Sequence, residues 1–282
     1  MHLQDFSNIS DVKNVRCGKS SDEIYLYTMS LNSSRHDILN LVTYLTSQEK
    51  DHANSYYTKE LSENYIIAHS TLRKVLSYHT KTYLHDVEFF IGKYGKPYLK
   101  NNQQNIGFNM SHSKDMLCIV VTKDAEVGVD VEFKDSSINV EELQNLVFSK
   151  QETEYINLLE SHAQKREFFY NLWTLKEAMV KSIGLGLSYP INQINLIDEA
   201  LNVKNSGIIK TTEPIQEHKL SLISCMTPST SLNIDKDYSY AIARRSNHKK
   251  VVQLELDATM THNNKPKFFL GTQKTRENSL CI

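Results

Sequence analysis

Several kinds of residue are scarce in this chain of 282 residues. It contains 4 cysteines, 5 prolines, 9 glycines and one tryptophan. So little glycine and proline excludes collagen-like and low-complexity polymers. The cysteines at 17, 118, 225 and 281 form neither a CxxC pair nor a metal-ligand spacing with histidine, which argues against a disulfide framework and a zinc site. We therefore expect a reducing, cytoplasmic environment.

The chain also has no large excess of charge of one sign. The chain has 32 Lys and Arg residues against 33 Asp and Glu residues, so it has no basic excess of the kind that nucleic acids or anionic membranes attract. No apolar run approaches the roughly 20 residues of a membrane span. Met1 to Asn14 has no basic region followed by an apolar one, so no signal peptide is predicted. Any anion site must be local.

The residues that are present describe a globular chain with mixed secondary structure. Hydrophobic residues make up 40% and charged residues 23%. In the first part, apolar periodicity predicts strands and helices in this order. They are a strand over Glu23 to Leu31, helices over Asp37 to Leu45, Ser47 to Lys59 and Ser62 to Tyr78, a strand over Val87 to Ile91 and a turn over Gly92 to Pro97.

The second part repeats the mixture. Strands are predicted over Ile106 to Met110, Leu117 to Val121 and Val127 to Phe133, a capping box starts a helix at Ser149, and a longer helix runs from Lys165 to Ser182. Gly184 and Gly186 are natural stops for that helix. Two further strands are predicted at Tyr238 to Ala243 and Val251 to Leu256, followed by a polar tail that we expect to be mobile.

Two helical segments match one another at a constant offset. The matching residues are Ile66, Ile67, Thr71, Leu72, Arg73 and Leu76 with Phe169, Tyr170, Thr174, Leu175, Lys176 and Met179. A helix led by serine precedes each segment, at Ser47 and Ser149. Amphipathic helices can match by chance, and the alternative is a duplicated α+β unit with a site in the cleft between its halves.

Two carboxylates share one face of a predicted strand. Asp130 and Glu132 project together because alternate side chains of a strand lie on the same side. They repel one another unless a cation lies between them. The wet face of an edge strand is the competing interpretation for such a pair.

The long helix carries a polar stripe beside its apolar face. Trp173, Glu177 and Lys181 are spaced i, i+4, i+8. An intrahelical ion pair is one interpretation. If Glu177 instead meets Asp130 and Glu132, the three carboxylates suit Mg²⁺, and Lys181 lies one turn away, where it can contact a phosphate. These are parts for phosphoryl-type transfer.

Two upstream segments can bind anions. Ser111 and His112 follow a predicted strand, where a hydroxyl and an imidazole can contact phosphate, although a lone histidine is more often a satisfied polar residue. Lys96 lies in a Gly-Lys-Pro turn and is by default an exposed lysine. Each of these residues is weak evidence for a phosphate site alone, and the evidence is stronger because they occur in the same chain.

Taken in order, five motifs resemble the signature series of the surfactin-type (Sfp-type) 4′-phosphopantetheinyl transferases, over about Ser47 to Pro190. They are Tyr94-Gly95-Lys96-Pro97, Phe108-Asn109-Met110-Ser111-His112-Ser113, Gly128-Val129-Asp130-Val131-Glu132, Phe148-Ser149 with Glu152, and Trp173-x-x-Lys176-Glu177-Ala178 with Lys181. No single motif is unique, whereas the ordered set is specific.

The resemblance implies an α+β fold, a pseudo-dimer of two similar α/β half-domains with the active site in the cleft between them. We expect an N-terminal half over 1–105, a C-terminal half with the metal site over 106–256, and a flexible tail over 257–282. The implied enzyme is a holo-[carrier protein] synthase, a cytoplasmic monomer that uses Mg²⁺. It moves the phosphopantetheine arm from coenzyme A to a serine of an acyl, peptidyl or aryl carrier protein, as in nonribosomal peptide or polyketide biosynthesis, and releases adenosine 3′,5′-bisphosphate.

The resemblance also assigns roles to individual residues. Asp130, Glu132 and Glu177 would bind Mg²⁺, and Glu177 would also be the base for the carrier serine. Lys181 and His112 would be catalytic and hold the pyrophosphate. The other implied contacts to coenzyme A are Ser111 beside them, Lys96 and Pro97 at the adenosine, and Lys176 on the phosphate side.

One position departs from the family pattern. Many relatives carry an arginine that contacts the 3′-phosphate of coenzyme A where this chain has His69, so Arg73 and Lys50 are the candidates to share that role. Two other functions use the same residues. One is a Mg²⁺-dependent phosphohydrolase that attacks with water, and the other is a relative that binds carrier proteins or coenzyme A without catalysis.

Overall fold

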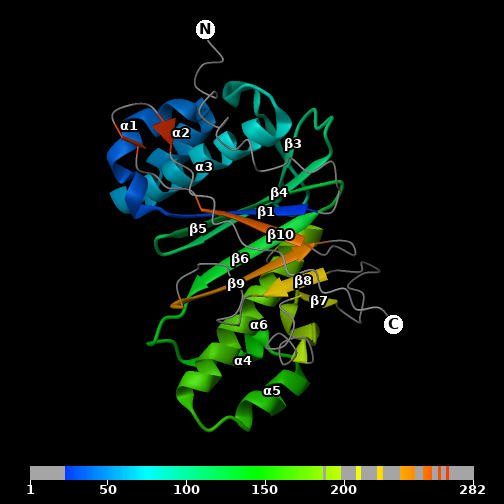
Figure 1. Ribbon diagram of the computed structural model, residues 1–282. Helices are drawn as coiled ribbons and strands as arrows, with labels where there is room; N and C mark the ends of the chain where they lie inside the picture. Colours follow the sequence, from blue (N-terminus) through cyan, green and yellow to red (C-terminus); the bar gives the residue numbers. More distant parts are fainter. Residues whose placement is uncertain are drawn as a thin grey trace.

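Two β-sheets form the middle of the molecule, and helices cover their outer faces (Figure 1). The computed structural model describes residues 23–186, 189–197, 208–210, 221–224, 236–244, 250–255, 260–261 and 265–266. The prediction of mixed helices and strands is therefore confirmed. Within these segments, no helix combines the length and the apolar character that crossing a membrane requires.

The first sheet contains strands from both ends of the chain. Its order is β10 (Lys250–Glu255), β1 (Glu23–Ser30), β5 (Met116–Lys123) and β4 (Ile106–Ser113). β10 runs parallel to β1, and the other neighbours are antiparallel. The helices on this side are α1 (Ile38–Leu41), α2 (Ser47–Asn54) and α3 (Lys59–Thr80), and a small hairpin joins β2 (Phe89–Ile91) to β3 (Pro97–Leu99).

The second sheet is antiparallel. Its order is β6 (Val127–Phe133), β9 (Tyr238–Arg244), β8 (Ser221–Ser224) and β7 (Ile208–Lys210). Its helices are α4 (Val140–Val147), α5 (Lys150–Asn157) and α6 (His162–Ile183). Short 3-10 turns occur at Asn32–Asp37, Val42–Tyr44, Leu84–Asp86 and Ile191–Gln193, and Met260–Thr261 pairs with Lys265–Pro266.

The alternation of side chains along β1 produces the layers. Tyr25 and Tyr27 belong to the core under α3, whereas Ile24 and Leu26 belong to a core shared with Val129 of the second sheet. Both faces of each central strand are therefore buried. This explains why β5 reads as a continuous apolar run rather than an alternating one.

The residue numbers of corresponding helices in the two halves differ by a constant. α3 spans 59–80 and α6 spans 162–183, so both ends differ by 103 residues. α2 at 47–54 and α5 at 150–157 differ by the same number, and so do their capping boxes at Thr46 and Ser149. The helix ends and capping boxes therefore share the offset of the sequence match.

Several details differ from the sequence predictions. The helix predicted from Asp37 to Leu45 is broken into short α and 3-10 turns, and α4 and β3 were not predicted. β4 and β5, which follow residue 105, pair with β1 in the first sheet. Most of the predicted tail over 257–282 lies outside the described residues.

A buried histidine in the first half should make folding sensitive to pH. His79 is 7% exposed, its Nε2 lies 2.7 Å from Tyr27 Oη, and burial lowers its pKa from 6.5 to about 4. The unfolded chain then binds a proton at a higher pH than the folded one, so this contribution is complete above pH 6.5 and is lost as the pH falls toward 4. We expect a loss on the order of 2–3 kcal/mol over that range.

Urea unfolding of the wild type and of His79→Gln at several pH values measures this contribution. The slope of unfolding free energy against pH should be smaller in the variant between pH 6.5 and 4. Equal slopes in the two proteins would contradict the assignment to His79.

Candidate active site

The two sheets meet at a seam between their edge strands β4 and β6, and side chains rather than a backbone ladder join them. Alternate residues of β4 make the bonds because they lie on one face of the strand. The bonds are Asn109 Oδ1 accepting from Val129 N (3.0 Å), Ser111 Oγ donating to Asp130 Oδ1 (2.9 Å) and Ser113 Oγ donating to Glu132 Oε2 (2.8 Å). The predicted carboxylate pair therefore lies at this seam.

Helix α6 approaches β6 very closely. A Cβ atom added at Gly128 would stand 2.1 Å from Ala178 O and 2.4 Å from Ser182 N, so only glycine allows this contact. The approach brings Lys181 Nζ to 2.6 Å from Asp130 Oδ1 and 3.0 Å from Ser111 Oγ. Lys181 thus pairs with β6 and not with Glu177 on its own helix, so the interpretation as an intrahelical ion pair is wrong.

Burial makes the acidic cluster of Asp130, Glu132 and Glu177 electrostatically costly. Asp130 is 2% exposed, so the interpretation as a wet strand face is wrong, and burial raises its pKa against the opposing effect of Lys181. Burial and the negative charge of Asp130 raise the pKa of Glu132 to about 7 and also raise that of Glu177. The single positive charge of Lys181 does not balance the negative charges of three ionised carboxylates.

The acidic cluster has the chemistry of a site for a hard cation. Asp130 Oδ2 is buried and has no hydrogen-bond partner among the described residues. A buried acceptor of this kind calls for a partner, and carboxylate oxygens are the ligands that Mg²⁺ prefers. In the described part of the chain, no three His, Cys, Asp or Glu side chains converge closely enough to hold a metal by themselves. The described residues therefore offer carboxylate oxygens to a cation but do not form a complete metal site by themselves.

His112 lies on the other face of β4 from Ser111. It is exposed, and desolvation together with the positive charge of Lys181 lowers its pKa. Across from it on α3, His69 stacks on Tyr65 with ring centroids 3.9 Å apart, and burial lowers the pKa of His69 to about 4. His69 is therefore a neutral imidazole at neutral pH.

Two cations named by the resemblance are held in ion pairs inside the protein. Lys176 is 0% exposed and contacts Glu152, whereas Arg73 is 3% exposed and contacts Glu49. Both point into their half of the molecule. Lys50 follows Glu49 on α2 and is half-buried.

Lys96 connects the small hairpin to both elements of the acidic cluster. Its Nζ donates to Glu126 Oε2 (2.7 Å), Val127 O (3.2 Å) and Ser182 O (2.9 Å). These acceptors lie just before or at the start of β6 and near the end of α6. The lysine is buried rather than exposed as its turn suggests, while Pro97 beside it begins β3 and is half-buried.

Replacing Lys96 by methionine should loosen this connection. The variant leaves two backbone carbonyls and the Glu126 carboxylate without their donor, and we expect it to lower the free energy of unfolding by about 2–4 kcal/mol. Urea unfolding measures the change. Lys93→Met is the control because Lys93 is exposed in the same turn and lies 5.0 Å from the Tyr94 ring centroid. Equal stability of both variants would contradict the role of Lys96.

Asn109 and Ser113 belong to one of the five motifs, but the sequence predictions gave neither residue a role. Both contact β6 from the same face of β4 as Ser111. The signal was present in the alternation of polar residues in Asn-Met-Ser-His-Ser, which has the period of a strand. The predicted strand ended at Met110, so the alternation was not extended through Ser113.

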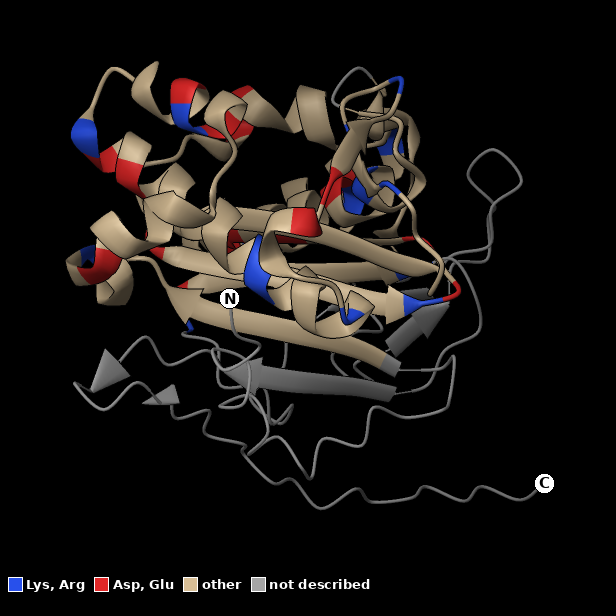
Figure 2. Cartoon of the chain, turned by 90° about the horizontal axis from the view of Figure 1, so that it is seen from above, with Lys and Arg blue, Asp and Glu red and all other residues tan. Residues whose placement is uncertain are grey.

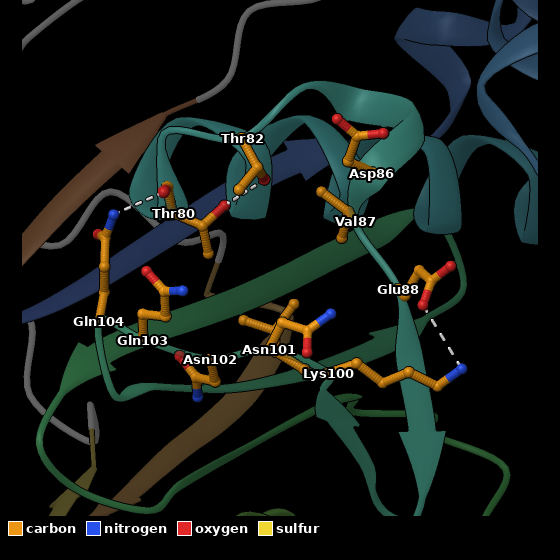
Figure 3. A pocket seen from close by; sticks show the side chains of 11 residues that line it. Thr80, Thr82, Asp86, Val87, Glu88, Lys100, Asn101, Asn102, Gln103 and Gln104 are labelled. Carbon is orange, nitrogen blue, oxygen red and sulfur yellow. Dashed lines mark hydrogen bonds and ion pairs between the residues drawn. The ribbon is translucent and has the colours of Figure 1, made fainter.

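A separate hollow lies at the end of α3 and shares no residue with the acidic cluster (Figure 3). Amides and hydroxyls line most of it, and Lys100 lies 3.5 Å from Glu88 at its rim. Elsewhere in the first half, acidic and basic residues are interspersed over the helices (Figure 2). The candidate active site is therefore defined by the side chains that join β4, β6 and α6 at the seam.

Comparisons with known proteins agree with the motifs. The model of the 4′-phosphopantetheinyl transferase superfamily matches residues 126–243, and the model of the N-terminal part of 4′-phosphopantetheinyl transferases matches residues 30–124. The junction of the two matches falls between β5 and β6, where the sheets also divide the chain.

Individual relatives cover most of the same region. The 4′-phosphopantetheinyl transferase HetI of Nostoc sp. (strain PCC 7120) is 29% identical over 170 residues, 60% of this chain and 71% of that protein. The transferase Sfp of Bacillus subtilis (strain 168) is 27% identical over 176 residues, 62% and 75%. The transferase gsp of Aneurinibacillus migulanus is 27% identical over 250 residues, 85% and 98%. Two family models covering successive parts of the chain, and relatives such as these, show that the chain belongs to the 4′-phosphopantetheinyl transferase superfamily and is of the surfactin type.

Proposed function

We propose that this enzyme transfers the 4′-phosphopantetheine arm of coenzyme A to a serine of an acyl, peptidyl or aryl carrier protein, with Mg²⁺. The observation that carries the proposal is the ion pair of Lys181 with the buried Asp130 at the seam between the sheets, with Glu132 and Glu177 near enough for the charge of Asp130 to raise their pKa values, in a member of this family. The relatives named above are transferases of this group.

In the proposed reaction the serine oxygen attacks the phosphorus next to the pantetheine arm. The bond from that phosphorus to the bridging oxygen breaks, and adenosine 3′,5′-bisphosphate leaves with the electron pair. Glu177 takes the serine proton, directly or through water. Lys181 and His112 hold the pyrophosphate, with the Ser111 hydroxyl beside Lys181.

The proposed metal ligands are Asp130, Glu132 and Glu177. Bound Mg²⁺ would neutralise charge that develops on the pyrophosphate oxygens. The unpartnered Asp130 Oδ2 and the raised pKa of Glu132 support this assignment. Lys96 and Pro97 are proposed to border the adenosine through the hairpin they begin, since the Lys96 ammonium already has three acceptors.

We further propose that the molecule is a pseudo-dimer of two α/β halves with coenzyme A bound between them, active as a monomer. The offset of 103 residues shared by helices and caps supports the two halves. The acidic cluster lies where β4 of one half meets β6 of the other, which supports a site between them.

Mass spectrometry of carrier proteins tests the function. Incubation with coenzyme A and Mg²⁺ should add about 340 Da, the mass of the arm, to at least one apo carrier in a panel. No shift on any carrier would contradict the proposal. Breakdown of coenzyme A without a carrier would instead support the phosphohydrolase, and binding without either reaction would support a non-catalytic relative.

A further inference from the structure

Helix α6 carries a buried cation directly next to Glu177 in sequence but directed away from the acidic cluster. Lys176 Nζ lies 2.5 Å from Glu152 Oε2 and 2.6 Å from Val147 O. Both charged side chains are 0% exposed. Neither side chain is exposed to solvent. Moving one of them away from the other would leave a buried charge without its partner, which is strongly unfavourable.

Glu152 extends the contact to the other elements of its half. Its Oε1 accepts from Leu196 N (2.7 Å), and its Oε2 also accepts from Ser149 N (2.7 Å). The pair of Glu152 and Lys176 therefore ties α6 to the end of α4, the start of α5 and the segment around residue 196. These attachments reach α6 through the side chain of Lys176, which contacts Val147 directly and Ser149 and Leu196 through Glu152.

The first half contains a matched pair without an acidic cluster beside it. Glu49 and Arg73 are 24 residues apart, as are Glu152 and Lys176. Arg73 Nη2 lies 2.9 Å from Glu49 Oε2, and Arg73 Nη1 donates to Val87 O at 2.7 Å, which repeats the combination of carboxylate and carbonyl. At the offset of 103 residues, however, the counterpart of Glu177 is Lys74.

The geometry of a helix links the buried pair to Glu177. Consecutive side chains stand about 100° apart around the helix axis, so Lys176 and Glu177 face different neighbours. Because both belong to the same helix, a rotation of α6 about its axis moves both side chains. A rotation of about 20° would move the end of a glutamate side chain by on the order of 2 Å. Misplacement by about 1 Å can cost roughly 100-fold in rate.

We propose that Glu152 and Lys176 are positioning residues for Glu177. Their buried pair fixes the rotation of α6 about its axis and so fixes where the Glu177 carboxylate stands relative to Asp130 and the cation. The matched pair of Glu49 and Arg73 stabilises its own half without this role. The inference rests on the proposed function in taking Glu177 as a ligand of Mg²⁺.

The test compares Lys176→Met with Arg73→Met, which removes the matched cation. Calorimetry measures the binding of Mg²⁺ to the protein with coenzyme A present, kinetics give kcat and the KM for coenzyme A, and urea unfolding gives stability. For Lys176→Met we expect Mg²⁺ binding at least about 10-fold weaker and kcat about 100-fold lower, with KM changed less than about 3-fold. For Arg73→Met, measured at coenzyme A concentrations that saturate the variant, we expect lower stability but Mg²⁺ affinity within about 2-fold of the wild type.

Two further variants separate position from folding. Lys176→Arg should recover most of the Mg²⁺ affinity, because arginine fills the same place in the first half. Glu152→Gln combined with Lys176→Met removes both charges, which lets the core fold without a buried ion, and it should still bind Mg²⁺ at least about 10-fold more weakly.

Either of two results would contradict the proposal. Wild-type Mg²⁺ affinity in the folded double variant, or the same loss of affinity in Arg73→Met, would overturn the positioning role. Failure of the proposed function is a different observation, since it would appear as wild-type protein that modifies no carrier.

Discussion

Replacing Asp130 by asparagine or Glu177 by glutamine should abolish most transfer activity while the protein stays folded. Each change removes one charged oxygen donor from the acidic cluster, and loss of such a group costs roughly 10²- to 10³-fold in kcat. Stability should change little, by about 1 kcal/mol or less, because burial already disfavours the charged form of both carboxyls. Mass spectrometry of the carrier protein gives the rate, and urea unfolding gives the stability.

Glu167→Gln is the matched control for these variants. Glu167 is a carboxylate of the same helix, but it is 48% exposed and pairs with Lys134 at the surface. Its replacement should leave both rate and stability close to those of the wild type. If Asp130→Asn and Glu177→Gln stay fully active, the acidic cluster is not the catalytic centre. If both unfold, the cluster serves structure first.

The second large effect is expected at Gly128. Alanine at this position would place its methyl group against the backbone of α6, 2.1 Å from Ala178 O, and backbone cannot move aside as a flexible side chain can. We expect a loss on the order of 4 kcal/mol in unfolding free energy. Activity should fall by more than about 100-fold, because α6 moves away from β6 and takes Glu177 and Lys181 with it.

Gly95→Ala separates this close approach from the general cost of replacing a glycine. Gly95 has a φ of +91° and nothing within 4 Å of the added Cβ, so only backbone strain of about 1–2 kcal/mol is expected. Comparison of urea unfolding for the two variants gives the difference. A Gly128→Ala protein as stable and active as Gly95→Ala would show that α6 is free to adjust.

The strands and long helices could be predicted where periodicity was strong. β6 was predicted with its observed bounds at Val127 and Phe133, and α6 was predicted to within a few residues at each end. α4 was missed because its eight residues give too short a pattern. The stretch from Asp37 to Leu45 looked continuous in sequence, but local 3-10 bonds interrupt it.

The acidic cluster was predicted from residue types, whereas the partners of the cations were not. Spacing along β6 and α6 indicated that Asp130, Glu132 and Glu177 could meet. Nothing in the sequence around Lys96 or Lys176 shows which carbonyl or carboxylate each one reaches, since those partners are 24 to 86 residues away. Long-range contacts of this kind depend on topology, which local patterns do not contain.

The parallel pairing of β10 with β1 has a consequence for synthesis on the ribosome. β1 is among the first described segments to be made, and β10, its neighbour on one side, is completed only at residue 255. Until then one edge of β1 exposes unpaired backbone groups, which can recruit strands from other nascent chains. The first sheet therefore keeps an open edge at β1 until the chain has been made through residue 255.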